Sequence, residues 1–177
     1  TLTENKIVKN LTLNGGTLNL GDKVLTVLGD VKIGQNSTTY LNVNKGYLTC
    51  KNLTVYDWGI ITMQDVNGLI CVENNFVMSN NYGNSTLTAG TMEVGGDFTI
   101  NPRYDSCFAA SGSHKVILNG DSKQTVSFNA KCSYFNILEL DNKSEEDVTI
   151  YMELEIDSID QELLKYNHSN LNNSYLC

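Results

Sequence analysis

The chain has 177 residues, of which 41% are hydrophobic, and its formal net charge is −8. This length and apolar content suit one domain with a sizeable core. The 11 lysines are dispersed and Arg103 is the only arginine, which argues against nucleic-acid binding, because that function needs clustered basic side chains. No apolar run approaches the roughly 20 residues of a membrane span, and no signal peptide is visible.

A strand motif returns about every 22 residues and is the main signal in the chain. Its four clearest copies are Val24–Val27, Tyr47–Cys50, Leu69–Val72 and Thr91–Val94. In each copy apolar residues alternate with polar ones, and a second short strand follows after a break. Because the period of two places alternate side chains on one face, each repeat offers two strands with one buried face.

The inward and outward positions follow from this alternation. The outward positions, which we expect to face solvent, are Thr26, Thr49, Cys71 and Glu93. The inward positions of the four copies are Leu25, Val27, Val31, Ile33, Leu48, Cys50, Leu53, Val55, Ile70, Val72, Phe76, Met78, Met92, Val94, Phe98 and Ile100. About 22 residues cannot bury such a face alone, so the repeats must stack. We therefore predict an all-β fold, a parallel β-helix in which the rest of each coil is the crossover.

The repeat extends in both directions beyond the four clear copies. Residues 7–13 and 16–20 form an initial coil, and residues 114–118, 124–128 and 134–140 continue the strand chemistry with less regular spacing. We predict six to seven coils within a β-helix domain of residues 1–158. Acidic residues crowd positions 145–162, where a charged final strand would cap the open end of the solenoid. Residues 159–177 are predicted to be a polar tail with a short helical turn near its start.

The five cysteines show no metal-ligand spacing, and we predict no metal site and no cofactor. Cys50 occupies an inward position and is interpreted as a small core hydrophobe. Cys107 and Cys132 are 25 positions apart, about one coil, so a disulfide between them is one alternative and free thiols are the other.

Asn-x-Ser/Thr matches begin at seven positions: Asn10, Asn36, Asn52, Asn84, Asn142, Asn167 and Asn172. In a chain rich in Asn, Ser and Thr, chance supplies many such matches. Asn10 and Asn52 also lie beside predicted strands. We interpret these asparagines as turn residues that tolerate the left-handed conformation. Asp30 and Asp97, each preceded by a glycine, are likewise interpreted as turn residues.

Aromatic residues recur in the turn after the second strand of successive repeats. Trp58, Tyr82 and Tyr104 are therefore expected along one edge of the body, with Arg103, Asn80 and Asn81 beside them. One hypothesis is a binding surface for sugar rings, with the polar neighbours forming hydrogen bonds. The alternative is an aromatic ladder that packs one turn on the next and stabilises the stack.

Residues 90–99, 108–120 and 124–128 carry a glycine-and-aspartate turn and a His-Lys-Val-Ile-Leu-Asn-Gly run. This pattern resembles the repetitive β-helical regions of Gram-positive bacterial cell-surface and adhesin-like proteins. The resemblance implies an extracellular or cell-wall-associated module, either adhesin-like, with a glycan or a host or cell-wall surface as ligand, or a structural spacer. It implies no catalytic residues, and we expect no enzyme activity.

Two other classes of protein share the predicted architecture. Polysaccharide lyases and hydrolases also use parallel β-helices, but fold does not fix function. Their sites need clustered acids with a basic residue, and the nearest acid in sequence to Arg103 is Asp105. Clustering of acids from different coils is not visible in the sequence. A β-helix that stacks end to end as a polymer is a further alternative. The acidic, polar C-terminal segment argues against that polymer.

Overall fold

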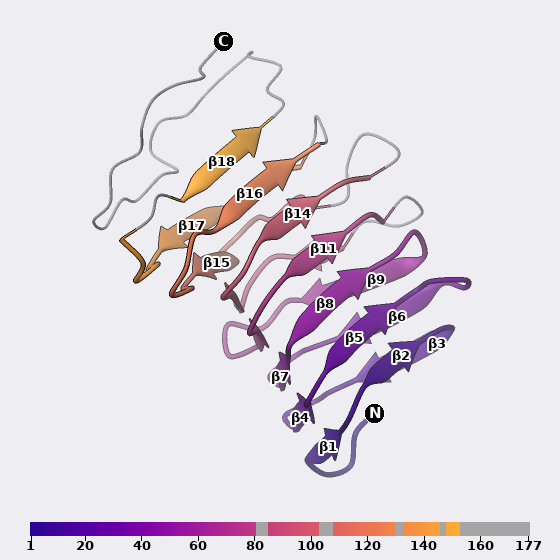
Figure 1. The fold of residues 1–177 in the computed structure, drawn as a ribbon. Coiled ribbons are helices and arrows are strands. Elements are labelled where there is room, and N and C mark those ends of the chain that lie inside the picture. Colours follow the sequence, from indigo (N-terminus) through magenta and orange to yellow (C-terminus); the bar gives the residue numbers. More distant parts are fainter. Residues whose placement is uncertain (81–84, 103–107, 130–132, 146–147, 153–177) are drawn as a thin grey trace.

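The computed structural model describes residues 1–80, 85–102, 108–129, 133–145 and 148–152. Within these ranges the secondary structure consists of short parallel strands wound into a β-solenoid of about six turns. Figure 1 shows the coils stacked in chain order from β1 to β18. The predicted all-β, parallel β-helical fold is confirmed.

The first side of the solenoid is a seven-stranded parallel sheet, here named sheet A. Its strands, in spatial order, are β1 (Lys6–Val8), β4 (Val24–Val27), β7 (Tyr47–Cys50), β10 (Leu69–Val72), β13 (Thr91–Val94), β15 (Lys115–Leu118) and β17 (Ile137–Leu140). Spatial order equals chain order, because each strand pairs with the corresponding strand of the next coil. The four repeat blocks that the sequence shows most clearly are β4, β7, β10 and β13.

The second side, sheet B, also has seven strands and contains the predicted second strand of each repeat. Its strands are β2 (Leu11–Leu13), β5 (Asp30–Ile33), β8 (Asn52–Val55), β11 (Phe76–Met78), β14 (Phe98–Ile100), β16 (Thr125–Phe128) and β18 (Thr149–Met152). The one proline, Pro102, follows β14 and lies outside the strands, as its missing N–H requires.

A third side, sheet C, was not predicted as a sheet of its own. Its four strands are β3 (Gly16–Asn19), β6 (Thr39–Asn42), β9 (Gly59–Met63) and β12 (Thr86–Leu87). Two isolated bridges, Leu87 to Ala110 and Ala109 to Tyr134, continue this side upward. The interpretation of two strands and a plain crossover per repeat was therefore wrong for the lower coils. Loops of unequal length, such as 34–38 and 56–58, precede these strands and hide their periodicity.

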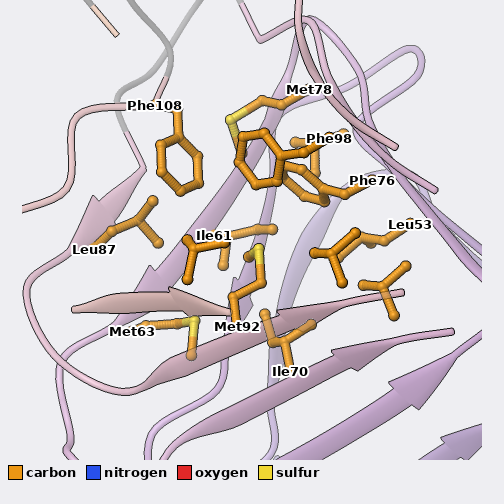
Figure 2. Packing of buried hydrophobic residues seen from close by; sticks show 14 of the residues in the cluster. Leu53, Ile61, Met63, Ile70, Phe76, Met78, Leu87, Met92, Phe98 and Phe108 are labelled. Carbon is orange, nitrogen blue, oxygen red and sulfur yellow. The ribbon is translucent and has the colours of Figure 1, made fainter. Parts of the chain in front are cut away.

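Strand pairing keeps equivalent side chains in columns that run along the stack. Leu48 pairs with Leu25 and Ile70, and Met92 pairs with Ile70 and Val116. All of the predicted inward residues are buried, with exposed fractions of 3% or less. The outward column, Thr26, Thr49, Cys71 and Glu93, is half-exposed. The alternation read from the sequence thus decides which side chains form the core (Figure 2).

The core becomes aromatic in its upper half. Phe98 is its centre: its ring centroid lies 4.9 Å from that of Phe76, 5.2 Å from Phe108, 5.9 Å from Phe128 and 5.0 Å from Phe135. Figure 2 shows the rings of Phe76, Phe98 and Phe108 grouped above Ile61 and Met92. Aromatic pairs at such distances contribute roughly 0.5–1.5 kcal/mol each beyond their buried area.

The C-terminal predictions fall mainly on residues that the structure does not describe. The polar tail, its helical turn and most of the acidic segment lie outside the described residues, so the predicted cap stays a prediction. In the described part of the chain there is no helix of the length and apolarity needed to cross a membrane.

Candidate functional site

Of the three aromatic residues predicted to form one edge, the structure describes Trp58 alone. Trp58 lies in the turn between β8 and β9 and is half-buried. Asn80, beside the predicted edge, is described and buried, with 1% of its surface exposed. Tyr82, Tyr104, Arg103 and Asn81 lie outside the described residues. The binding surface and the stabilising ladder therefore both stay open as readings of this edge.

The turn that holds Trp58 is fixed to the coil below through its backbone. The N–H of Trp58 donates to the carbonyl of Gly34 in the coil below at 3.1 Å, and its carbonyl accepts from the N–H of Thr39 at 2.9 Å. Gly59 N–H closes the turn by donating to the carbonyl of Tyr56 at 2.9 Å. The indole is thus carried on a backbone that the stack itself positions.

The most extensive polar constellation is a row of Asn and Asp side chains at the corner between sheets A and B. We name it the corner ladder, and it consists of Asn10, Asp30, Asn52, Asn75 and Asp97. Each of these residues directly precedes, or begins, the strand of sheet B in its own coil. In each coil the side chain therefore faces the same corner of the coil above.

Side-chain oxygens in the corner ladder accept hydrogen bonds from the next coil. Asn10 Oδ1 accepts from the N–H of Asp30 at 3.0 Å, and Asp30 Oδ1 accepts from Asn52 Nδ2 at 2.8 Å. Asn52 Oδ1 then accepts from the N–H of Asn75 at 3.2 Å, and Asn75 Oδ1 from the N–H of Asp97 at 2.8 Å. Asp97 Oδ1 continues the row by accepting from the N–H of Thr125 at 2.8 Å. The ladder thus spans six coils.

Two glycines explain why the ladder can come so close to the backbone above it. A Cβ at Gly96 would lie 2.5 Å from Asn75 Oδ1, and a Cβ at Gly29 would lie 2.1 Å from Asn10 Oδ1. Both distances are well below ordinary van der Waals contact. The Gly-Asp pairs 29–30 and 96–97 therefore leave room for the asparagine of the coil below.

Other corners of the first coils use the same device. Asn5 Oδ1 accepts from the N–H of Val24 at 2.9 Å, and Asn14 Oδ1 accepts from the N–H of Asn36 at 2.8 Å. On the outer face of sheet C, Asn42 Nδ2 donates to Asn19 Oδ1 at 2.6 Å. Side-chain amides thus join successive coils at more than one place around the solenoid.

Gln124 takes over this role inside the upper coils, where it is fully buried. Its Nε2 donates to the carbonyls of Val94 at 2.9 Å and Gly96 at 2.6 Å. Its Oε1 accepts from Gly120 N–H at 2.9 Å and from Asn142 Nδ2 at 2.7 Å. This one amide satisfies backbone groups in two coils and binds a third segment, so it stabilises the stack. A Cβ at Gly120 would lie 2.9 Å from Gln124 Cδ, so this glycine leaves room for the amide.

The two described cysteines are free thiols in different environments. Cys50 is fully buried, which confirms its predicted core position, and burial raises the pKa of its thiol to about 12. Cys71 lies on the outer face of sheet A and is half-buried, and burial also raises its pKa. Neither thiol is activated as a nucleophile. The predicted alternatives for Cys107 and Cys132 concern residues outside the described ranges.

Some charged side chains in the described ranges form ion pairs at the surface. Lys115 Nζ lies 2.9 Å from Glu139 Oε2 on the outer face of sheet A, and Lys23 Nζ lies 2.8 Å from Asp22 Oδ1. The hydrogen bond and charge of Lys23 lower the pKa of the Asp22 carboxyl. No group of three His, Cys, Asp or Glu side chains placed to hold a metal ion occurs among the described residues.

Comparison with protein-family models, curated proteins and solved structures found no match to this chain. The confirmed part of the resemblance is the repetitive parallel solenoid itself. Its relation to Gram-positive surface proteins stays a prediction.

The corner ladder is what the sequence interpretation missed. Asn10, Asn36, Asn52 and Asn142 were interpreted as left-handed turn residues, but the one non-glycine with positive φ among the described residues is Asn44, with φ 53°. That interpretation was wrong for these four residues. The side chains of Asn10, Asn52 and Asn142 form hydrogen bonds. Asn36 donates its backbone N–H to Asn14 Oδ1. The sequence does carry a signal for the corner ladder: an Asn or Asp lies directly before, or at the start of, the second strand of each of these repeats.

Proposed function

We propose that this chain is a non-enzymatic structural module of an extracellular or cell-wall-associated protein, a rigid solenoid that acts as a spacer. The observation that supports the proposal is the corner ladder. Its polar side chains bind the next coil, so these groups stabilise the stack. At roughly 4.8 Å per coil, about six coils separate the two ends of the body by on the order of 30 Å.

Rigidity follows from how the coils are joined. Every coil is paired to its neighbours by the strands of sheets A and B, and amide side chains add bonds at the corners between them. Parallel pairing along the whole stack gives each repeat contacts with its two neighbours, so stability grows with the number of coils. A module of this kind holds two attached segments at a fixed distance.

An adhesin-like glycan module is the competing function, and Trp58 is the described residue that favours it. Trp58 is partly exposed in the turn between β8 and β9. Aromatic faces stack on sugar rings, and a solenoid edge would repeat such a face at each coil. The spacer proposal instead gives Trp58 a packing role in the turn between β8 and β9.

The two functions differ in one measurable property, saturable binding of glycans or cell-wall material. We would titrate the intact chain on a glycan array and against isolated peptidoglycan, alongside Trp58→Ala and a matched aromatic control, Tyr40→Ala. Tyr40 is 40% exposed on β6 of sheet C and is not one of the residues of the predicted edge. The spacer proposal expects no saturable binding and a lower Tm for Trp58→Ala. Saturable binding that Trp58→Ala abolishes and Tyr40→Ala retains would overturn it.

A further inference from the structure

His114 occupies a position that glycine holds in the three coils directly below. The pairing of β13 with β15 places it beside Gly90, and the pairings of β7, β10 and β13 place Gly46, Gly68 and Gly90 in the same column. Its side chain points inward, with 0% of its surface exposed. The position above these three glycines thus carries an imidazole ring where each glycine has no side chain.

The imidazole ring lies among aromatic side chains rather than polar ones. Its centroid is 5.9 Å from that of Phe108, with an edge-to-face angle of 71°. Phe108 in turn contacts Phe98 and Phe135. His114 is therefore part of the aromatic core that holds the upper coils together.

Neither ring nitrogen of His114 has a hydrogen-bond partner within the described part of the chain. The coil above interacts with its backbone instead, because Asn136 Nδ2 donates to the carbonyls of Gly112 at 3.0 Å and His114 at 3.5 Å. A neutral ring already leaves one buried N–H unpaired. A protonated ring would place two unpaired donors and a full charge in an apolar site, which is far less favourable.

The charged groups on the neighbouring strands are directed away from this ring. Lys115 of β15 and Glu139 of β17 pair with each other on the outer face of sheet A, and Glu93 of β13 lies on that same face. The segments 108–113 and 133–136 contain one titratable side chain, the exposed Tyr134, and β11 and β14 contain none. No described carboxylate is therefore placed to stabilise an imidazolium at this position.

We propose that His114 makes the upper coils of the solenoid open in acid while the lower coils stay stacked. Protonation favours a state in which the ring leaves the core, and this separates Phe108 from His114 and Phe135, which lie just before β15 and β17. The opening is local because each coil contacts its two neighbours and the lower core is largely aliphatic. Burial also lowers the pKa of His114 to about 4, so opening belongs to the range below about pH 5.

Hydrogen exchange of the intact chain at pH 7.0 and pH 4.5, corrected for intrinsic rates, tests this proposal. We expect peptides that cover β15 and β17 to lose at least tenfold protection at pH 4.5, while those covering β7 and β8 keep theirs. In His114→Leu the acid response of β15 and β17 should disappear. An equal loss in lower and upper coils, or the same response in His114→Leu, would overturn the proposal.

A second measurement keeps the proposal testable if His114→Leu does not fold. The pKa of the ring in the unsubstituted chain can be followed by NMR of the imidazole signals, with His168 as the other histidine. We expect His114 to titrate below pH 5 together with loss of the β15 amide signals. Titration near 6.5 with unchanged amide signals would contradict the proposal.

Discussion

Asn75 accepts a 2.8 Å hydrogen bond at its Oδ1 from the backbone N–H of Asp97, the residue next to it in the following coil. The contact is exposed to solvent, yet backbone N–H groups donate in the same way at four of the five links from Asn10 to Thr125, and Asn52 Nδ2 donates at the other. Strand pairing alone leaves corner N–H groups without partners, because the chain turns there between two sheets. The corner ladder supplies the missing acceptors, and its contribution to stability can be measured.

Asn75→Ala removes one acceptor from the ladder. A net contribution of about 1 kcal/mol is typical of such a bond, and a chain of this size should then lose about 2–4 °C in Tm. Asn74→Ala is the matched control, because its described hydrogen bonds, to Lys51 and from Gly96, use backbone atoms. Equal Tm values for the two variants would argue against a stabilising ladder.

Gly96→Ala should destabilise the chain by about 1–3 kcal/mol, the usual cost of forcing an extra methyl into a close contact. The new Cβ would meet Asn75 Oδ1 at 2.5 Å and the backbone of Asn74 at 2.7 Å. Part of the cost therefore depends on Asn75. In a double-mutant cycle measured by chemical denaturation, Gly96→Ala should cost about 0.5 kcal/mol less in the Asn75→Ala background. Strict additivity would show that the two residues do not interact.

Stability should depend on pH through His114. Its pKa is about 4 in the folded chain and about 6.5 when unfolded, so between these values the unfolded state binds the extra proton. The free energy of unfolding is therefore highest above pH 6.5, and it falls by up to about 3 kcal/mol as the pH is lowered to 4. Urea unfolding of the chain and of His114→Leu at several pH values checks this. If the free energies of unfolding of the two proteins changed equally between pH 6.5 and pH 4, His114 would not be the cause of the pH dependence.

Cys50 and Cys71 should differ in their reaction with a thiol reagent. Cys50 is fully buried with its pKa raised to about 12, whereas Cys71 is half-buried on the outer face of sheet A. Since the thiolate is the reactive species, alkylation of Cys50 requires opening of the coil. Peptide mapping after brief treatment with iodoacetamide should find Cys71 modified before Cys50. Modification of Cys50 at the faster rate would contradict its place in the core.

The sequence was sufficient for the sheets whose spacing is regular. For Leu48, Ile70 and Met92, the alternation of apolar residues and the 22-residue period both predict an inward position. The three side chains are buried and lie in one column along the stack. Sheet C was missed because loops of unequal length precede β6 and β9 and shift their register in the sequence.

The contacts between coils needed the structure. Asp30 and Asn52 are 22 positions apart, and their hydrogen bond exists because the pairing of β5 with β8 places them side by side. The same holds for His114, which a sequence shows as a polar residue before a strand and the structure shows as fully buried. Neither local propensity nor composition reports on contacts made one coil away. Of the predicted binding edge, Trp58 is described, and its role stays a prediction.

The central claim is that corner side chains bind the next coil, and amide exchange at Asp97 tests it most directly. In the unsubstituted chain the Asp97 N–H should be protected by its bond to Asn75, measured residue by residue by NMR. In Asn75→Ala we expect that protection to fall about tenfold or more at Asp97, the equivalent of losing about 1.4 kcal/mol of local stability. Protection at Phe76 should change little, because its N–H donates to a backbone carbonyl. Unchanged protection at Asp97 would contradict the account.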